Sequence, residues 1–271
     1  MERQALKGVN LTAREGKFLA LAGRTGSGKS TLALIMAGLL APDTGSISIG
    51  GKDLAKVKPK ERRTLRLSVG MVFQYPEAQL FADTVAEDIA FGPKNLDLTE
   101  SEVQARVRAA MEAVHLPNTF ADKSPFMLSG GEKRRVAIAG VLALHPRILI
   151  LDEPTAGLDP RARESLLLKL QELKDGGMGI VLISHNMEDI LRLADEVAIL
   201  KEGEVVLQGV PREVFMQTET LRAANLEPPP LLHLLAELKH HGLPLARTAF
   251  TEEAAVQEIL TAIQVRGMKP C

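Results

Sequence analysis

A glycine-rich segment near the start of the chain has the residue types and spacing of a phosphate-binding loop. Residues 23–30 read Gly-Arg-Thr-Gly-Ser-Gly-Lys-Ser, which fits the pattern G-x-x-x-x-G-K-[ST]. The glycines let backbone N–H groups turn inward around phosphate oxygens, and the helix that follows adds the positive end of its dipole. We expect Lys29 to reach the β- and γ-phosphates of a nucleotide and the Ser30 hydroxyl to bind Mg²⁺. The expected phosphate-binding residues are Gly23, Arg24, Thr25, Gly26, Ser27, Gly28, Lys29, Ser30 and Thr31.

Two carboxylates follow an apolar run in the second half of the chain. Residues 148–151 are Ile-Leu-Ile-Leu, the pattern of a strand buried on both faces of a parallel sheet, and Asp152 and Glu153 come directly after it. Because strand ends in α/β sheets face the ligand crevice, Asp152 is placed to hold Mg²⁺ through water. Glu153 is placed to polarise an attacking water molecule. The alternative is a carboxylate pair that only caps a helix, and the phosphate loop in the same chain disfavours it.

The segment Leu-Ser-Gly-Gly-Glu at 128–132 predicts a second phosphate-binding helix start. Ser129 is a candidate N-cap, and Gly130 and Gly131 would let a ligand approach bare backbone amides. We include Ser129, Gly130, Gly131 and Glu132 among the expected nucleotide-binding residues. Taken alone, the segment is equally compatible with a simple serine-capped helix.

Hydrophobic periodicity indicates an α/β core that could position these segments. Apolar runs predict strands at 19–22, 69–73, 148–151, 180–183 and 197–200, an edge strand at 46–50, and a hairpin into 204–207 through Glu202-Gly203. Capping signals predict helices after Thr99 and after Asp159. The pattern divides the chain into a core at 1–74 and 146–210, a helical subdomain at 75–145, and a small C-terminal extension at 211–271 with helices at 231–241 and 252–263.

Composition narrows the possible partners. The chain has 271 residues and a formal net charge of -1, with no dense basic stripe, so we expect no nucleic-acid partner. The single cysteine, Cys271, cannot form an internal disulfide and is expected to be an exposed tail residue. The apolar stretch near 136–144 falls far short of the roughly 20 residues that a membrane-spanning helix needs. Any work at a membrane would therefore require a partner that spans it.

The order of these segments resembles that of the ABC ATPase family across residues 5–210. Gln74 lies where that family has its Q-loop glutamine, Gly157-Leu158-Asp159 matches the D-loop, and His185 matches the switch histidine. The resemblance implies a P-loop NTPase (RecA-like) core that hydrolyses ATP with Mg²⁺. It also implies that His185 contacts the γ-phosphate, that Gln74 serves catalysis and Mg²⁺ binding, and that Asp159 helps to bind nucleotide.

Other segments resemble the ATPases of energy-coupling factor (ECF) transporters, which import vitamins or transition-metal ions such as cobalt and nickel. They are 73–77 (Phe-Gln-Tyr-Pro-Glu), 79–81 (Gln-Leu-Phe), 91–95 (Phe-Gly-Pro-Lys-Asn) and 131–140. Tyr75, in place of asparagine, resembles one of the two ATPase types in these transporters. Glu132, in place of the glutamine common in the wider family, is the residue expected for the ECF type. The region from 211 resembles the extra domain through which the two ATPases touch.

The resemblance implies an assembly at the cytoplasmic face of the cell membrane. Two ATPases face head to tail, each ATP lying between one phosphate loop and the partner's 128–132 segment. We expect a heterodimer with a sister ATPase, with a homodimer as the alternative, and an integral membrane subunit in contact with residues 74–95. The alternative functions are the ATPase of another ABC importer, or a cytosolic ATPase acting in DNA repair or iron–sulfur assembly. Lys29 and Ser129 are only 100 positions apart, and the segment between them holds no heptad run, which disfavours the DNA-repair class.

One expected feature is not found in the sequence. Members of the family usually begin with a strand whose aromatic residue stacks on adenine, and no aromatic residue precedes Phe18 here. Phe18 itself is expected in the core. The resemblance therefore implies either a start further upstream or weaker adenine binding, since stacking contributes about 1–3 kcal/mol per base.

Overall fold

A six-stranded sheet forms the centre of the protein, described by a computed structural model over residues 4–245 and 252–265. The strand order is β4-β5-β6-β1-β7-β8. The first five are parallel, and β8 runs antiparallel to β7. The bounds are β1 Phe18–Ala22, β4 Val69–Val72, β5 Ile148–Asp152, β6 Gly179–Ile183, β7 Glu196–Lys201 and β8 Glu204–Gly209. The strands predicted from apolar runs are confirmed within one or two residues at each end.

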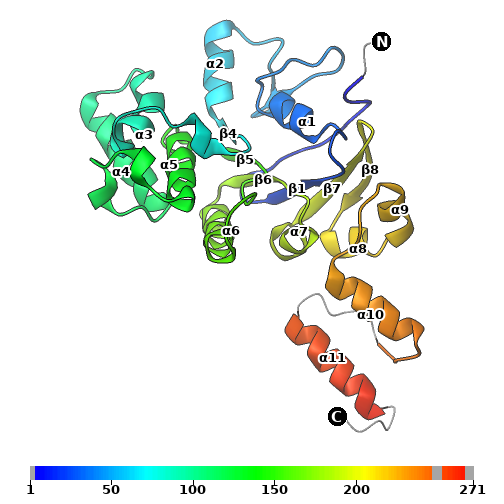
Figure 1. The fold of residues 1–271 in the computed structure, drawn as a ribbon. Helices are drawn as coiled ribbons and strands as arrows, with labels where there is room; N and C mark the ends of the chain where they lie inside the picture. Colours follow the sequence, from blue (N-terminus) through cyan, green and yellow to red (C-terminus); the bar gives the residue numbers. More distant parts are fainter. Residues whose placement is uncertain (1–3, 246–251, 266–271) are drawn as a thin grey trace.

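Helices cover both faces of the sheet. The helix α1 (Lys29–Met36) lies on one side, and α6 (Pro160–Asp175) and α7 (Met187–Leu193) lie on the other (Figure 1). Alternate residues of β1 face the two sides: Leu19 and Leu21 belong to one apolar cluster, whereas Phe18 belongs to another on the opposite side. This two-sided burial explains why the parallel strands are continuous apolar runs. Phe18 is fully buried, so its predicted place in the core is confirmed.

A helical lobe lies beside the β4 edge of the sheet (Figure 1). Its helices are η1 Pro76–Gln79, α3 Val85–Lys94, α4 Glu100–Ala113, η2 Asn118–Phe120, η3 Pro125–Met127 and α5 Gly130–Leu142. The Thr99 side chain accepts a hydrogen bond from the Glu102 N–H while Glu102 bonds back to Thr99, so the predicted capping box is confirmed. Between β4 and this lobe, the chain turns at Tyr75 in a left-handed conformation (φ 53°).

The strand predicted at 46–50 is present but covers only two residues, and it does not join the main sheet. The structure has a small separate hairpin there, in which β2 (Ser48–Ile49) pairs antiparallel with β3 (Lys52–Asp53). The two residues between the strands, Gly50 and Gly51, both have positive φ angles of 57° and 76°. Such angles suit a tight two-residue hairpin turn, so the chain folds back on itself before it can extend the main sheet. The helix α2 (Pro59–Leu67) then leads into β4.

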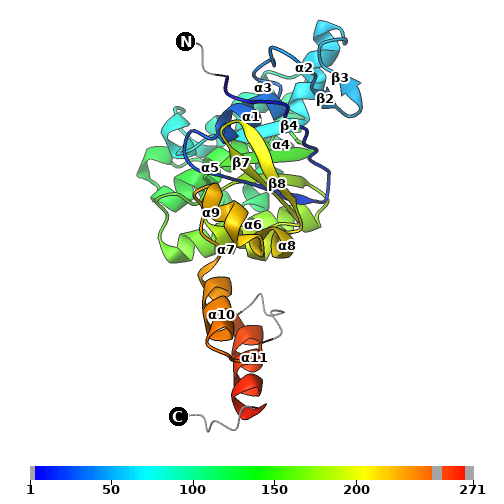
Figure 2. The same ribbon diagram turned by 90° about the vertical axis from the view of Figure 1, so that its right-hand side faces the viewer.

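The C-terminal region forms an appendage. After α8 (Pro211–Phe215) and α9 (Thr218–Ala223), the helices α10 (Pro230–His240) and α11 (Glu252–Val265) form a hairpin that projects away from the sheet (Figures 1 and 2). This hairpin has its own small apolar cluster around Leu235 and Ala262. The α/β fold with a helical insertion and a C-terminal appendage is therefore confirmed. No helix in the described residues is long and apolar enough to cross a membrane. Cys271 lies outside the described residues.

Candidate functional site

The glycine-rich loop joins β1 to α1, as the sequence predicts. The loop begins at Gly23 (φ 151°) and ends at Gly28 (φ 107°). A Cβ atom on Gly23 would overlap the carbonyl oxygen of Leu200, and one on Gly28 would lie 2.7 Å from the carbonyl oxygen of Ala5. Both positions therefore require glycine, for conformation and for space. The loop lies against the backbone at Ala5 and Leu200, and it leads directly into the start of α1.

Lys29 spans this loop with its side chain. Its Nζ donates hydrogen bonds to the carbonyl oxygens of Gly23 (2.6 Å) and Arg24 (3.0 Å). Burial lowers the pKa of the Lys29 ammonium below its ordinary value, although the carboxylates of Glu153 and Asp152 oppose that shift. The ammonium group is thus held at the mouth of the loop, where an anionic phosphate would meet both its charge and the N-terminus of α1.

Ser30 and Asp152 meet across the base of the site. Ser30 Oγ, in the first turn of α1, donates a hydrogen bond of 2.8 Å to Asp152 Oδ2 at the end of β5. The described residues contain no group of three or more His, Cys, Asp or Glu side chains that would form a metal cage. A hydroxyl and one carboxylate beside a phosphate loop instead fit Mg²⁺, which uses few protein oxygens together with substrate phosphates and water. The donor set therefore suits Mg²⁺ bound with a nucleotide.

Glu153 stands next to Asp152 in an unusual backbone conformation. Its φ angle is 48°, in the left-handed region that non-glycine residues rarely adopt, and its N–H donates to the carbonyl oxygen of Ile183 at 3.0 Å. His185 follows β6, and its Nδ1 lies 2.9 Å from Glu153 Oε2. The two strand ends thus direct a carboxylate and an imidazole toward each other. A carboxylate that a neighbouring polar group holds in position is the arrangement expected of a general base.

One cleft of about 740 Å³ collects most of the predicted catalytic and phosphate-binding residues. They are Thr25, Gly26, Gly28, Lys29, Ser30, Thr31, Gln74, Asp152, Glu153 and His185. Gly23, Arg24 and Ser27 belong to the same loop, where Ser27 is buried and its N–H donates to the carbonyl oxygen of Arg24. The structure therefore assembles in one place residues that are up to 162 positions apart in the sequence, from Gly23 to His185.

Part of this cleft was not predicted from the sequence. Gln4, Ala5, Lys7, Glu202 and Gly203 also line it. The Gly203 N–H donates to the carbonyl oxygen of Ser27 (2.9 Å), and the Lys7 N–H donates to that of Gly203 (2.8 Å). Glu202-Gly203 was identified only as the β7–β8 turn, because a turn motif gives no sign of what the turn packs against.

The 128–132 segment lies in a different cleft. Ser129 caps α5, and its Oγ accepts a hydrogen bond from the Glu132 N–H, while Glu132 accepts bonds from the N–H and the hydroxyl of Ser129. These bonds from Ser129 lower the pKa of the Glu132 carboxyl. Ser129, Gly130, Gly131, Glu132 and Asp159 line a cleft of about 530 Å³ that contains none of the phosphate-loop residues. One chain therefore does not bring the two predicted phosphate-binding elements together.

A buried arginine that was not predicted to matter connects α5 with η1 and with the segment that follows Glu153. Arg134 on α5 is 2% exposed and forms a two-pronged ion pair with Glu77, with hydrogen bonds of 3.0 and 2.8 Å. It also donates to the carbonyl oxygens of Pro154 (2.7 Å) and Ala156 (2.8 Å), just after Glu153. Burial alone would raise the pKa of the Glu77 carboxyl, but the hydrogen bonds from Arg134, a backbone hydrogen bond and the charges of Arg134 and Lys133 together lower it.

Comparison with known proteins shows the family to which this chain belongs. Residues 6–156 match the model of the ABC transporter family. The chain is 49% identical to the energy-coupling factor transporter ATP-binding protein EcfA2 of Caldanaerobacter subterraneus over 98% of this chain and 92% of that protein. It is 48% identical to the protein of the same name from Clostridium tetani, over 96% of this chain and 90% of that one.

Solved structures agree with these relatives. The structure of cbiO1 from Clostridium perfringens, part of the ABC transporter complex cbiONQ, superposes with a TM-score of 0.73 at 41% identity, over 86% of this chain and 92% of that one. The ATP-binding cassette MJ0796, solved as a dimer bound to ADP and Pi, superposes with a TM-score of 0.67 at 30% identity, over 76% and 90% of the two chains. The chain therefore belongs to the ABC transporter family, among its energy-coupling factor transporter ATP-binding proteins.

Proposed function

We propose that this chain binds and hydrolyses ATP as an energy-providing subunit of an ECF-type importer. The observation that carries the proposal is the meeting of Lys29, the Ser30–Asp152 pair and the Glu153–His185 pair in one cleft. These are the groups that phosphoryl transfer to water needs: a phosphate cradle, a place for Mg²⁺, and a positioned base. The rival readings, an ATPase of DNA repair or of iron–sulfur assembly, lack any such support from the named relatives.

Each group has a distinct role in this proposal. The loop amides and Lys29 hold the β- and γ-phosphates. Ser30, Asp152 and Gln74 would hold Mg²⁺, which neutralises the charge that develops on those phosphates. Glu153 orients the attacking water molecule and accepts its proton. His185 keeps the Glu153 carboxylate in place and extends toward the γ-phosphate.

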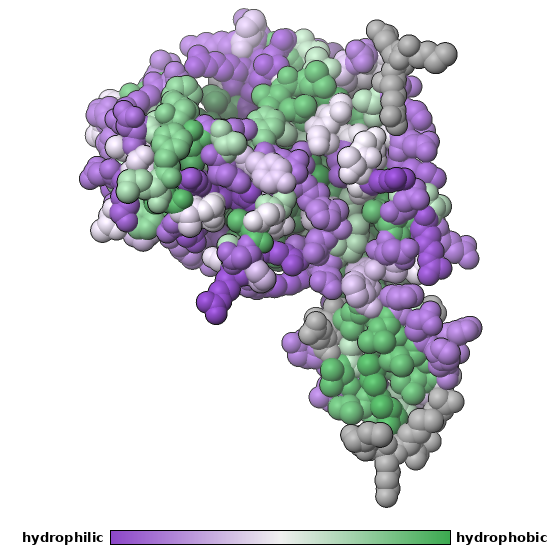
Figure 3. Space-filling view, in the orientation of Figure 1, coloured by the Kyte–Doolittle hydropathy of each residue, from purple (hydrophilic) through white to green (hydrophobic). Residues whose placement is uncertain are grey.

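A second ATPase would complete the site. The phosphate loop and the Ser129–Glu132 segment occupy separate clefts, and each presents a helix N-terminus suited to phosphate. A head-to-tail pair would place both around one nucleotide, so that ATP closes the pair and hydrolysis releases it. We expect the partner to be a sister ATPase, with a second copy of this chain as the alternative. The 211–271 extension would add to the contact, since α10 and α11 present a contiguous apolar surface (Figure 3).

An integral membrane subunit would bind at residues 74–95. Tyr75, Phe81 and Phe91 are exposed there, although aromatic side chains of this size are usually buried. The rings of Phe81 and Phe91 meet edge to face, with their centroids 5.0 Å apart. Gln74 lines the phosphate cleft and directly precedes this surface in the chain, so a change at the nucleotide would reach the membrane subunit through Gln74. The chain would then reside at the cytoplasmic face of the membrane as a peripheral subunit.

The substitution Glu153→Gln tests the catalytic proposal. Without a base, hydrolysis at this chain's site should slow by about 10²–10⁴ while ATP still binds. The complex is isolated from membranes through a tag on this chain and loaded with limiting photoreactive ATP carrying a label on either the α- or the γ-phosphate. Crosslinking at successive times then reports how fast the γ-label, relative to the α-label, is lost from this chain.

The control is Glu112→Gln, on α4 and outside both clefts. The wild-type chain and this control should lose the γ-label with time, whereas Glu153→Gln should retain it. Equal rates of loss in Glu153→Gln and in the wild type would contradict the proposed role of Glu153. A wild-type chain that binds ATP but never loses the γ-label would contradict the ATPase function itself.

A further inference from the structure

His185 depends on its neighbours for its position. Its side chain is 76% exposed, so packing restrains it little. The residues on either side of it are held much more firmly. Ser184 is buried, its N–H donates to the carbonyl oxygen of Leu21 (3.2 Å), and its Oγ accepts a hydrogen bond of 3.0 Å from the Asn186 N–H. The backbone on both sides of His185 therefore sets where the imidazole points.

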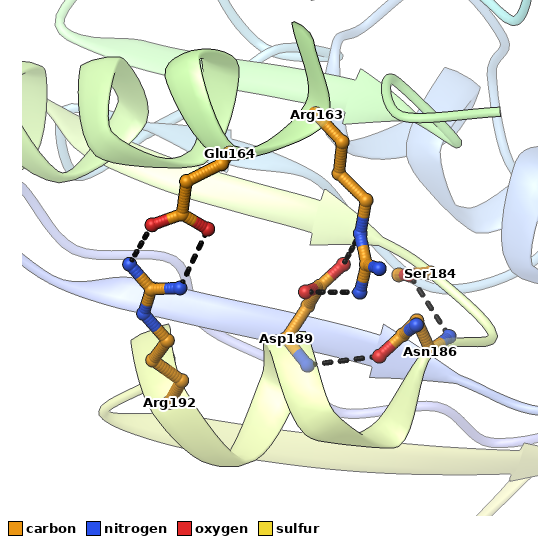
Figure 4. A network of polar contacts seen from close by, with 6 residues as sticks. All are labelled: Arg163, Glu164, Ser184, Asn186, Asp189 and Arg192. Carbon is orange, nitrogen blue, oxygen red and sulfur yellow. Dashed lines mark hydrogen bonds and ion pairs between the residues drawn. The ribbon is translucent and has the colours of Figure 1, made fainter. Parts of the chain in front are cut away.

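Asn186 connects this short segment to α7. It is the N-cap of the helix, and its Oδ1 accepts a hydrogen bond of 3.0 Å from the Asp189 N–H. Figure 4 shows Ser184, Asn186 and Asp189 as one continuous set of polar contacts leading from the end of β6 into the first turn of α7. A shift of that first turn would consequently move the backbone of His185.

The first turn of α7 is anchored to α6 by a largely buried ion pair. Arg163 donates to both carboxylate oxygens of Asp189, through Nη2 at 2.7 Å and through Nε at 3.3 Å (Figure 4). The Asp189 side chain is only 6% exposed and that of Arg163 is 34% exposed. Loss of the guanidinium would remove the hydrogen-bonded partner of a buried carboxylate and leave only the weaker charge interaction with Arg192, which favours rearrangement. The Arg163 N–H also donates to the carbonyl oxygen of Asp159 (2.9 Å), so the arginine is fixed to the very start of α6.

A second ion pair between the same two helices provides an internal comparison. Arg192 donates to both oxygens of Glu164 at 2.8 and 2.6 Å, which is equally two-pronged (Figure 4). Both side chains are 48% exposed, and Arg192 lies near the end of α7 rather than in its first turn. Such an exposed pair contributes little, and it has no hydrogen-bonded connection to Asn186 in Figure 4.

We propose that Arg163 and Asp189 are positioning residues for His185, and through it for Glu153, in ATP hydrolysis. The inference rests on the proposed function, because it concerns the rate of that reaction. Arg163 holds Asp189, Asp189 holds the capped start of α7, and that turn fixes the histidine 2.9 Å from the base. The pair also connects His185 to the start of α6, where Asp159 faces the second cleft. A change at the cleft that contains Asp159 would thereby reach Glu153 in the phosphate-loop cleft.

The decisive experiment compares Arg163→Met with Arg192→Met in the membrane-isolated complex. Both substitutions keep the apolar stem and remove the guanidinium from the same pair of helices. We expect Arg163→Met to slow loss of the γ-label about 10-fold, in the range that a misplaced catalytic group costs, with ATP affinity within about twofold of wild type. Arg192→Met should leave the rate within about twofold of wild type.

A second comparison tests whether the effect passes through His185. In a His185→Ala background, Arg163→Met should slow the residual reaction by no more than about twofold, because there is no imidazole left to misplace. The double variant Arg163→Met with Asp189→Asn removes the buried charge that Arg163→Met alone leaves without its hydrogen-bonded partner. If this charge does not slow hydrolysis by disturbing the fold, the double variant should be as slow as Arg163→Met. Amide hydrogen exchange in 184–189 should quicken in Arg163→Met and not in Arg192→Met.

Each other outcome overturns the inference in a distinguishable way. Equal rates in Arg163→Met and Arg192→Met would exclude the positioning role. If Arg163→Met slows hydrolysis by the same factor in the His185→Ala background as in the wild type, Arg163 has a purely structural role. If His185→Ala alone leaves the rate unchanged, the error lies in the proposed function of His185 and not in its anchoring.

Discussion

Lys29, Glu153 and His185 each combine a local backbone feature with a contact from a distant segment. Lys29 begins a helix directly after a left-handed glycine, and Glu153 takes up a left-handed conformation at the end of a buried strand. His185 follows the neighbouring strand, which puts it beside Glu153 although the two are 32 positions apart. Backbone strain of this kind is concentrated at functional sites, where the surrounding structure holds it in place.

Removal of the Lys29 ammonium should weaken nucleotide binding itself. Lys29→Ala deletes a charge-assisted contact to phosphate that contributes about 2 kcal/mol, so ATP affinity should fall roughly 30-fold. Fluorescence titration with a nucleotide analogue measures the change, and Lys60→Ala, on the exposed surface of α2, is the matched control. Wild-type affinity in Lys29→Ala would count against a phosphate contact at this position.

The predictable residues are those whose role is encoded in a few adjacent positions. Lys29, Ser30, Asp152 and Glu153 follow from local patterns, since a phosphate loop and a strand that ends in carboxylates are each contiguous. His185 and Gln74 required the family resemblance, because a lone histidine or glutamine has no distinguishing pattern. Gly203 was missed because its contact with Ser27 joins segments 176 positions apart that share no motif.

At the scale of elements, a helix cap explains how the chain presents its second predicted phosphate-binding segment. Ser129 and Glu132 exchange hydrogen bonds around the first turn of α5, which leaves the amides of the two intervening glycines at the helix start. The sequence indicated Ser129 as a candidate cap and the segment as a predicted phosphate-binding site, although the segment taken alone is equally compatible with a simple capped helix. The reciprocal bond from Glu132 explains why a carboxylate suits this position.

The same cap gives a pH-dependent prediction. The folded-state pKa of Glu132 is lowered by its bonds from Ser129, so its contribution is complete above the ordinary carboxyl pKa and is lost as the pH falls through the lowered value. Glutamine can form the bonds without the charge, so Glu132→Gln should reduce the free energy of unfolding by about 0.5 kcal/mol near pH 7. The difference should vanish once the pH has fallen below the lowered pKa of Glu132.

Urea denaturation at a series of pH values checks this expectation. The control is Glu112→Gln, in the last turn of α4, where the helix dipole gives a carboxylate no such advantage. A difference between wild type and Glu132→Gln that persists unchanged at low pH would show that the charge of Glu132 is not responsible.

Contacts between elements were the part of the fold that the sequence did not reveal. Arg134 and Glu77 are 57 positions apart, and each by itself resembles an ordinary surface charge. Their pairing becomes visible only when α5 packs against η1. The pair at Arg163 and Asp189 escaped notice for the same reason. The strands, by contrast, were predicted closely because burial on both faces forces a continuous apolar run.

At the scale of the whole molecule, the two clefts and the C-terminal hairpin all indicate a protein that works in an assembly. The phosphate loop and the Ser129–Glu132 segment are separate within one chain. The α10–α11 hairpin projects away from the sheet (Figure 2) and bears an apolar surface (Figure 3). Leu234 on α10 and Val256 and Leu260 on α11 are exposed. Contiguous apolar surface of this kind commonly marks a protein interface.

Affinity isolation of the tagged chain from detergent-solubilised membranes of its source cells tests whether the chain works in a membrane-bound ATPase assembly. Mass spectrometry identifies what co-purifies, and cells that express the tag alone provide the background. We expect recovery of a second ABC ATPase and an integral membrane protein, both in amounts comparable with the chain itself. Recovery of the chain only from the soluble fraction, with no integral membrane partner, would contradict it.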